Sequence, residues 1–441
     1  MYSKLPLLLF VFACVSALVV KESTRNIDVS TSIAKVDVHL NIINDDTKAL
    51  KQFVFPLSPS STVTVVKVDG NVVKFSVNRD ENSHSIVTDL PTSLAKGSSC
   101  SIDISYISAD VYTPTPESMA MSDTQHVKII TSSNIVLPYR VQRQTTTVSG
   151  SSLFDSAKLT KIDGKSAKIT LGPQEADFKA APLDAVFVAQ FPIVRGSLTR
   201  TLRLEPFVGA YFKEEFALSH KGSVIEGEWS RFDLQRNPKL AQASMNQINL
   251  KLLPYTNPKS ISYRDYIGNI STSQYISNSQ ADTDLQLIPR FPLYGGWNFK
   301  FSLTGKLLKS AFNQMMNTRE ARVALIPAVD DVFFDRVNVR VSLPQFARIE
   351  SFHASLPGTV CTRVENSFTH LDVVGAQTVE CVLRDVANVM GNSDFVVRFE
   401  YNSLYSLFKP LFVVAIISVL YGIYRALSWF VSLLTPKTKL E

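Results

Sequence analysis

The sequence predicts a mainly β protein, made of two tandem β-sandwich-like domains followed by one C-terminal transmembrane helix. Apolar and polar residues alternate with a period of two in many segments of the body, which is typical of half-buried strands. The body has no convincing long amphipathic helix, and one apolar segment near the C-terminus is long enough to cross a bilayer. The length of 441 residues, 45% of them hydrophobic, suits two domains and excludes a disordered or collagen-like chain.

The first 17 residues are typical of a secretory signal peptide. Lys4 precedes an apolar run over 5–15 that is too short to span a bilayer, and the small residues Ser16 and Ala17 follow it. We therefore expect cleavage after Ala17, a mature chain from Leu18, and a body that lies in the lumen. The alternative, a buried N-terminal helix, does not explain why Lys4 precedes the run.

Strands are expected throughout the body. The alternation is clearest in four segments, namely 36–42, 100–106, 337–343 and 395–401. Asp69-Gly70-Asn71 and Asp163-Gly164-Lys165 are turns of the kind that join hairpin strands. The best helix candidate is 306–322, which contains Ala and Met and has no Pro.

The body divides into two expected domains, 18–237 and 238–405. Asn237-Pro238 opens a polar stretch, and this change of composition marks the predicted boundary. Each part then has a normal domain size.

A transmembrane helix is expected at 410–434. The segment is apolar except for Arg425, and at about 1.5 Å per residue it is long enough for a hydrocarbon core of about 30 Å. A short cytosolic tail, 435–441, follows. Lys437 and Lys439 in this tail resemble a dilysine signal for retrieval to the endoplasmic reticulum. The same lysines also suit a positively charged cytosolic flank.

Three cysteines remain after removal of the signal peptide: Cys100, Cys361 and Cys381. In an oxidising lumen an odd number leaves one pair and one free thiol, or no pair at all. Cys361 and Cys381 are close in sequence and flank a run that looks like paired strands, so they are the favoured disulfide. Cys100 lies in an alternating strand, where a buried apolar role is favoured over a reactive one.

The sequence contains no motif for catalysis, for a metal, for a cofactor or for nucleic acid. Its net charge of +6 is dispersed, without a block of Lys and Arg. Clustered histidines, a nucleophile elbow, a Walker loop and a Rossmann fingerprint are all missing from it. Asp330, Asp331 and Asp335 form the densest acidic group, for which a solvated loop is favoured over a pair of glycosidase carboxylates.

Two local strings stand out. The first, 263–273, contains Asn269-Ile270-Ser271, which is the only N-glycosylation sequon of the sequence and follows a Gly in an expected exposed turn. The second, 289–297, has two prolines that favour an extended edge, a Gly-Gly turn, and Trp297 as an anchor. Taken alone, the second string is a hairpin with a wide loop.

These strings resemble the most recognisable block of the ribophorin I family, whose members are subunits of the oligosaccharyltransferase complex. Further segments resemble the same family, namely 27–40, 171–173, 186–205 and 222–236. The resemblance implies a single-pass type I protein of the endoplasmic-reticulum membrane with a lumenal body. By the same resemblance, Asn269 matches the family's sequon and is expected to be glycosylated. Some members continue into a long cytosolic region, so a ribosome-facing role is not implied here.

The resemblance further implies a non-catalytic accessory subunit without a cofactor. In that complex a separate multi-span subunit transfers a preassembled glycan from a dolichol-linked donor to Asn in Asn-X-Ser/Thr of nascent proteins. The implied partners are the catalytic and other subunits of the complex, nascent polypeptides, the translocon, and the membrane. The alternative is a free-standing chaperone or cargo receptor that binds clients through exposed β edges. A lumenal hydrolase is a third possibility, and it would need convergent acids that the sequence does not supply.

Overall fold

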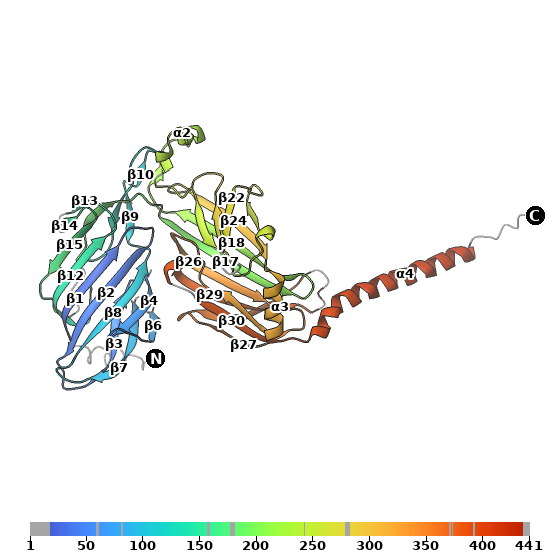
Figure 1. Ribbon diagram of the computed structural model, residues 1–441, viewed down its shortest axis with the longest axis horizontal. Helices are drawn as coiled ribbons and strands as arrows, with labels where there is room; N and C mark the ends of the chain where they lie inside the picture. The colour runs from blue at the N-terminus through green and yellow to red at the C-terminus, as the bar shows by residue number, and fades with distance from the viewer. Residues whose placement is uncertain are drawn as a thin grey trace, which may run out of the picture.

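The computed structural model describes residues 18–434, except 59–60, 81–82, 157–158, 177–180, 242, 278–282, 370–371, 373 and 391–392. Strands hold 55% of the residues and helices 14%, which confirms the predicted mainly β class. Figure 1 shows two β lobes side by side and one long helix, α4 (Phe408–Leu434), that projects away from the second lobe. The predicted signal peptide and the tail with Lys437 and Lys439 lie outside the described residues.

The N-terminal lobe is built on an eight-stranded sheet. In spatial order its strands are β14 (Thr160–Asp163), β15 (Ser166–Leu171), β12 (Arg140–Ser149), β1 (Leu18–Asp28), β2 (Ala34–Asn44), β8 (Ser99–Ser108), β4 (Ser61–Val68) and β5 (Asn71–Val72). Strands β1 and β12 are parallel, and the other neighbours are antiparallel. The predicted turns at 69–71 and 163–165 join β4 to β5 and β14 to β15.

One face of this sheet is buried and the other is exposed. In β2, for example, Val36, Val38 and Leu40 are buried, whereas Asp37 and His39 are exposed. Two smaller sheets cover the buried face. The strands of the first, in spatial order, are β3 (Leu50–Leu57), β7 (Ser83–Leu94) and β6 (Phe75–Asp80). The strands of the second are β13 (Leu153–Ser156), β16 (Ala185–Val188), β11 (His126–Ile129) and β9 (Tyr112–Thr115). Side chains from all three sheets form one core, which burial of apolar surface stabilises.

The C-terminal lobe repeats this plan on a seven-stranded sheet. Its strands in spatial order are β21 (Ser262–Asp265), β24 (Asn298–Lys306), β18 (Gly209–His220), β17 (Val194–Glu205), β26 (Val332–Ser342), β29 (Ala376–Ala387) and β28 (Val360–Ser367). Strands β17 and β26 are parallel, and the other neighbours are antiparallel.

Two three-stranded sheets and a helix complete the second core. The strands of one sheet, in spatial order, are β20 (Ile248–Lys251), β23 (Thr283–Leu287) and β22 (Ser273–Ser277). Those of the other are β25 (Glu320–Ala324), β30 (Asp394–Glu400) and β27 (Arg348–Ala354). The helix α3 (Lys309–Thr318) lies inside the predicted segment 306–322, whose two ends belong to β24 and β25. The short helices are α2 (Arg231–Arg236), η1 (Pro238–Ala241), η2 (Pro258–Ser260), η3 (Asn388–Met390) and η4 (Ser403–Leu407).

The chain passes from the first hydrophobic core to the second between Ile193, which is buried in the first, and Val194, which is buried in the second. This point lies upstream of the boundary expected at 237–238. Strands β17 and β18 pair with β26 and β24 and therefore belong to the second lobe. The polar stretch that suggested the boundary begins with η1, directly after the exposed helix α2, and its Met245 is buried in the core of the second lobe. We propose 18–193 and 194–401 as the two domains. No Pro-rich or Gly-rich linker marks the division in the sequence.

Direct contacts join the lobes. Arg195, the second residue of β17, pairs with Asp110 of the N-terminal lobe and, across 2.6 Å from Nη2 to Oδ1, with Asp335 of the C-terminal lobe. A short parallel pair of strands, β10 (Ser118–Met119) and β19 (Val224–Ile225), makes a second connection. A small hydrophobic cluster that includes Ile33, Ile107 and Phe333 also lies between the lobes, so an ion pair, a strand pair and apolar packing hold them together.

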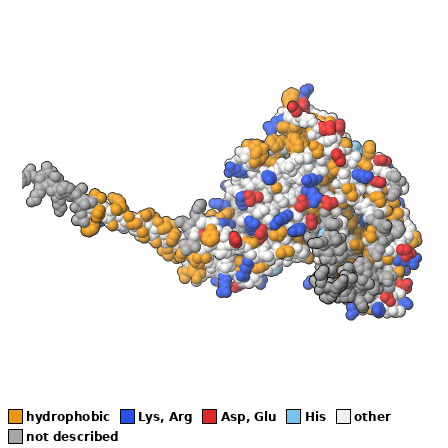
Figure 2. All heavy atoms as spheres, turned by 180° about the vertical axis from the view of Figure 1, so that it is seen from behind, with side chains coloured by type: hydrophobic (Ala, Val, Ile, Leu, Met, Phe, Trp, Pro, Cys, Tyr) orange, Lys and Arg blue, Asp and Glu red, His pale blue; other side chains and the backbone are white. Residues whose placement is uncertain are grey.

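Helix α4 carries its apolar side chains on the outside, as Figure 2 shows. The segment from Ser403 to Val431 contains an unburied stretch of 18 residues with a mean hydropathy of 2.0, so it is long and apolar enough to cross a membrane. Lys409 ties the helix to the lobe, because its Nζ lies 2.8 Å from Oδ1 of Asp372, whose side chain is 2% exposed. Burial raises the pKa of Asp372, but the hydrogen bonds from Lys409 and Thr369 outweigh it and lower that pKa.

Candidate functional site

The sequon follows a tight turn at the end of β21. The Oδ1 atom of Asp265 accepts hydrogen bonds from the backbone N–H groups of Ile267 and Gly268, both at 2.9 Å, and the N–H of Asp265 donates to the carbonyl of Gly268. An Asp that caps its own turn in this way fixes the backbone of the loop. Tyr266 and Ile267 form the tip, where their side chains are exposed.

Asn269, the predicted glycan acceptor, is exposed immediately after this turn. It lies opposite Arg264 in an isolated β-bridge, and Ser271 of the sequon is also exposed. Between them Ile270 is buried in the core of the lobe. The sequon is thus presented to solvent on a backbone that is anchored on both sides.

An ion pair connects the two strings that stood out in the sequence. Arg290, from the second string, donates from Nε to Oδ2 of Asp265 at 2.6 Å and from Nη2 to the carbonyl of Asn269 at 3.0 Å. The Asp265 side chain is 1% exposed and that of Arg290 is 30% exposed. Burial raises the pKa of Asp265, but Arg290 and the two turn amides outweigh it and lower that pKa. The carboxylate therefore stays charged and holds the sequon loop in place.

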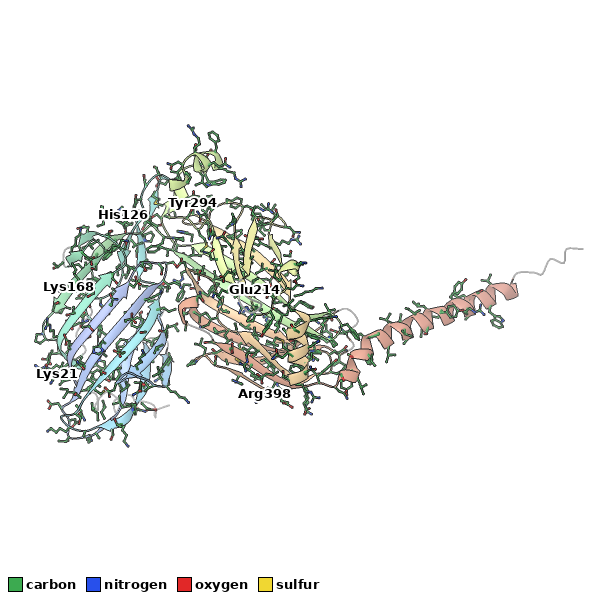
Figure 3. All side chains as sticks on the ribbon, in the orientation of Figure 1. Lys21, His126, Lys168, Glu214, Tyr294 and Arg398 are labelled. Carbon is green, nitrogen blue, oxygen red and sulfur yellow. A yellow bond between two sulfur atoms is a disulfide. The ribbon has the colours of Figure 1, made fainter. Side chains whose placement is uncertain are left out.

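An aromatic cluster lies beside this ion pair, formed by Trp229, Phe291, Tyr294 and Trp297. Its rings meet edge to face, with 5.5 Å between the centroids of Tyr294 and Trp297 and 6.3 Å between those of Trp229 and Trp297. Figure 3 shows Tyr294 below α2, near the junction of the lobes. Trp297 is thus an anchor in a cluster, as the second string predicted.

The segment that contains α2 docks on the second string. Arg231 donates from Nη2 to the carbonyl of Arg290 at 2.6 Å, and its guanidinium lies over the ring of Trp229. The sequence indicated Trp229 and Arg231 only as part of the segment that resembles the family. Their contacts depend on the way the chain folds back, which no local pattern reveals.

The structure joins Cys361 and Cys381 in a disulfide. These residues are direct partners in the antiparallel pair of β28 and β29, where side chains on the same face are adjacent. Cys100 is buried and unbonded, and burial, with a smaller effect of Asp69, raises the pKa of its thiol to about 11. A thiol with so high a pKa is a poor nucleophile.

The acidic group 330–335 lies at the junction of the lobes, where its members have partners. Asp335 binds Arg195, and Asp330 accepts a hydrogen bond from Asn388 at 2.9 Å. Burial, with a contribution from Asp330, raises the pKa of Asp331. The residues that the structure describes contain no group of three or more His, Cys, Asp or Glu side chains arranged to hold a metal ion.

Comparison with known proteins assigns this chain to a family, because the Ribophorin I family matches residues 18–428. The chain belongs to the ribophorin I family. The match runs through both lobes and most of α4, and it confirms the resemblance that the two strings carry.

Curated relatives of this ribophorin I chain are named as subunits of one enzyme complex. Dolichyl-diphosphooligosaccharide–protein glycosyltransferase subunit 1A of Arabidopsis thaliana is 26% identical, over 91% of this chain and 68% of that protein. Subunit 1 of Caenorhabditis elegans is also 26% identical, over 92% of this chain and 72% of that protein. Among solved structures, yeast LTA4 hydrolase overlaps 42% of this chain and 31% of its own at 11% identity, with a TM-score of 0.30.

Proposed function

We propose that this chain is a non-catalytic accessory subunit of the endoplasmic-reticulum oligosaccharyltransferase complex. In that role it supports the transfer of a preassembled glycan from a dolichol-linked donor to Asn in Asn-X-Ser/Thr of nascent proteins. The observation that carries the proposal is the family match over 18–428, together with relatives named as subunit 1 of this glycosyltransferase. The match spans both lobes and most of α4, so the proposal concerns the whole architecture.

The contacts of the chemically interesting side chains favour a structural role. Arg195 binds Asp335 at the lobe junction, and Arg290 binds Asp265 beneath the sequon loop. Cys361 and Cys381 are bonded to each other. Each of these groups stabilises the lobes or their junction, as expected of a subunit whose active-site partner is another polypeptide.

The proposed topology is single-pass type I, with the two lobes in the lumen and α4 in the membrane. A disulfide persists in an oxidising compartment, and the exposed sequon needs lumenal access to become glycosylated. Both features lie on the lobes, so both favour a lumenal body. The proposed partners are the catalytic and other subunits, with nascent polypeptides and the translocon nearby.

The test is purification of the tagged full-length chain from microsomes in a mild detergent, followed by quantitative mass spectrometry. We expect the multi-span catalytic subunit in near-stoichiometric amount. A tagged single-span lumenal protein that is unrelated in sequence serves as the control and should recover little of it. A clean preparation of this chain without the catalytic subunit would contradict the proposal.

Depletion separates this function from the alternative, a chaperone or cargo receptor. Loss of an accessory subunit lowers sequon occupancy on many glycoproteins. Loss of a chaperone leaves occupancy normal and causes a few clients to misfold. Normal occupancy across the glycoproteome after depletion would therefore favour the alternative.

A further inference from the structure

A cavity of about 770 Å³ opens where the C-terminal lobe meets α4. Three parts of the chain form its wall: the end of α3, the turn between β26 and β27, and the segment from the end of β30 into η4. The charged and aromatic side chains of the wall include Arg319, Phe346, Arg348, Glu400 and Tyr405. The side chains that line the cavity thus come from segments far apart in sequence.

The cavity carries two positive groups and one negative group. Arg348 and Glu400 face each other across β27 and β30 as direct partners in the sheet, and Arg319 follows α3. Neighbouring Arg322 and Arg398 are paired with Glu320. Within the described part of the chain, in contrast, no salt bridge involves Arg319, Arg348 or Glu400.

Two residues of the wall have a backbone conformation that residues other than Gly rarely adopt. Arg319 has φ of 55° and Phe346 has φ of 67°, both in the left-handed region. Such a conformation is unfavourable for a residue other than Gly, and it is often retained at binding sites. In both cases the strain positions a side chain in the wall of the cavity.

Aromatic rings connect the cavity to the start of α4. The Phe346 ring lies 5.2 Å from that of Tyr405 and 5.0 Å from that of Phe408, measured between centroids. Leu404 and Leu407 expose their side chains beside them in η4. Aromatic residues at the end of a membrane span favour the headgroup layer, so this wall lies at the depth of the headgroups when α4 is in a bilayer.

We propose that this cavity binds the headgroup of a zwitterionic membrane phospholipid, phosphatidylcholine. The phosphate binds Arg319 and Arg348, since guanidinium groups match phosphate oxygens. The quaternary ammonium binds near Glu400 and the faces of Phe346 and Tyr405, which attract cations. The acyl chains extend past Leu404 into the bilayer. This inference goes beyond the proposed function, because it requires only that α4 lies in a membrane.

The charge pattern favours a zwitterionic headgroup over an anionic one. A purely anionic headgroup would satisfy the two arginines but would place its own negative charge near Glu400. Phosphatidylcholine supplies a positive charge for that carboxylate at the other end of the same headgroup. The two arginines and Glu400 therefore match the two charges of one headgroup.

The test is native mass spectrometry of the full-length chain in a detergent without phosphate. Dihexanoylphosphatidylcholine is the probe, and dihexanoylphosphatidylglycerol and inorganic phosphate are the comparison ligands. We expect one tightly bound phosphatidylcholine and at least tenfold weaker binding of the other two. Glu400→Gln should reduce the preference for phosphatidylcholine over phosphatidylglycerol.

The key variant is Arg319→Gly, because it removes the guanidinium and relaxes the left-handed backbone at the same time. We expect binding at least tenfold weaker than wild type with the fold retained, and the same loss for Arg348→Gln. The matched control is Arg322→Gln, which changes an exposed arginine of the same small sheet outside the cavity. Equal binding by Arg319→Gly and Arg322→Gln would overturn the proposal, as would tighter binding of phosphatidylglycerol or phosphate than of phosphatidylcholine.

Discussion

Arg290 donates from Nε to the buried carboxylate of Asp265 across 2.6 Å and so joins the sequon loop to the aromatic cluster. The same guanidinium reaches the carbonyl of Asn269. One side chain therefore supports both the turn and the backbone of Asn269, the predicted glycan acceptor.

Replacement of Arg290 by Gln should destabilise the C-terminal lobe by about 2 kcal/mol, because it leaves the charge of Asp265 buried without its partner. This expected destabilisation is smaller than that for a fully buried ion pair, since the Arg290 side chain is 30% exposed. Chemical denaturation of the full-length chain measures the change in the free energy of unfolding. Arg264→Gln, on the exposed side of the same loop, is the control and should change it little. Equal losses for both variants would contradict the role of the pair.

His220 predicts a dependence of stability on pH. Its Nε2 lies 2.8 Å from the carbonyl of Ala243, and its Nδ1 accepts from the N–H of Gly222 at 3.0 Å. Burial lowers the pKa of His220 from 6.5 to about 4. The folded chain thus binds this proton less readily than the unfolded chain does. Its contribution to stability is complete above pH 6.5 and decreases as the pH falls toward 4, by about 3 kcal/mol in total.

Denaturation between pH 7 and pH 4 tests this prediction. His220→Gln keeps a donor for Ala243 but cannot titrate, so its stability should change less over this range than that of wild type. His353→Gln, which changes an exposed histidine, should follow the wild-type curve. Identical curves for His220→Gln and wild type would show that other groups cause the effect.

The disulfide predicts a large effect from loss of either cysteine. Cys361 and Cys381 are 20 residues apart, and closing a loop of that size stabilises a fold by about 3 kcal/mol. Cys361→Ser should therefore lower the free energy of unfolding by this amount, and peptide mapping without reductant should recover the linked peptides from wild type. Cys100→Ala removes a free thiol and should leave the linked peptides intact. Recovery of Cys100 in a disulfide would contradict the pairing.

The single sequon predicts one glycan, attached to Asn269, on the full-length chain expressed in the secretory pathway. Asn269→Gln and Ser271→Ala should each abolish a single mass shift that is sensitive to endoglycosidase H. The control Ser273→Ala should keep it, because this serine lies outside the sequon. All three positions are exposed, so stability should change by no more than about 0.5 kcal/mol. An unshifted wild-type chain would show that the sequon is not used.

Alternation predicted the strands because a strand with one face more buried than the other alternates apolar and polar residues. The segments 36–42, 100–106, 337–343 and 395–401 lie in or at the end of β2, β8, β26 and β30. A period of two records which side of a strand is buried, and this information is local. It does not record which strands are neighbours.

The features that the sequence did not reveal depend on contacts between distant segments. Asp265 and Arg290 pair because β21 lies at the edge of the large sheet with the second string beside it. Arg319 and Arg348 reach the same cavity only because β25 and β27 flank β30. The polar stretch after residue 237 suggested a boundary, because polar composition does not distinguish a linker from a segment that packs on a lobe, as this one does through Met245.

The two parallel strand pairs have a consequence for synthesis of the chain. In each large sheet an early strand, β1 or β17, pairs with a late one, β12 or β26. A chain that enters a compartment from its N-terminus cannot complete either sheet until the late strand has followed. All strands of the first lobe's three sheets end by Val188, so the first lobe can close while the second is still being translated. The nascent second lobe then emerges beside a finished neighbour, whose Asp110 is already in place to receive Arg195.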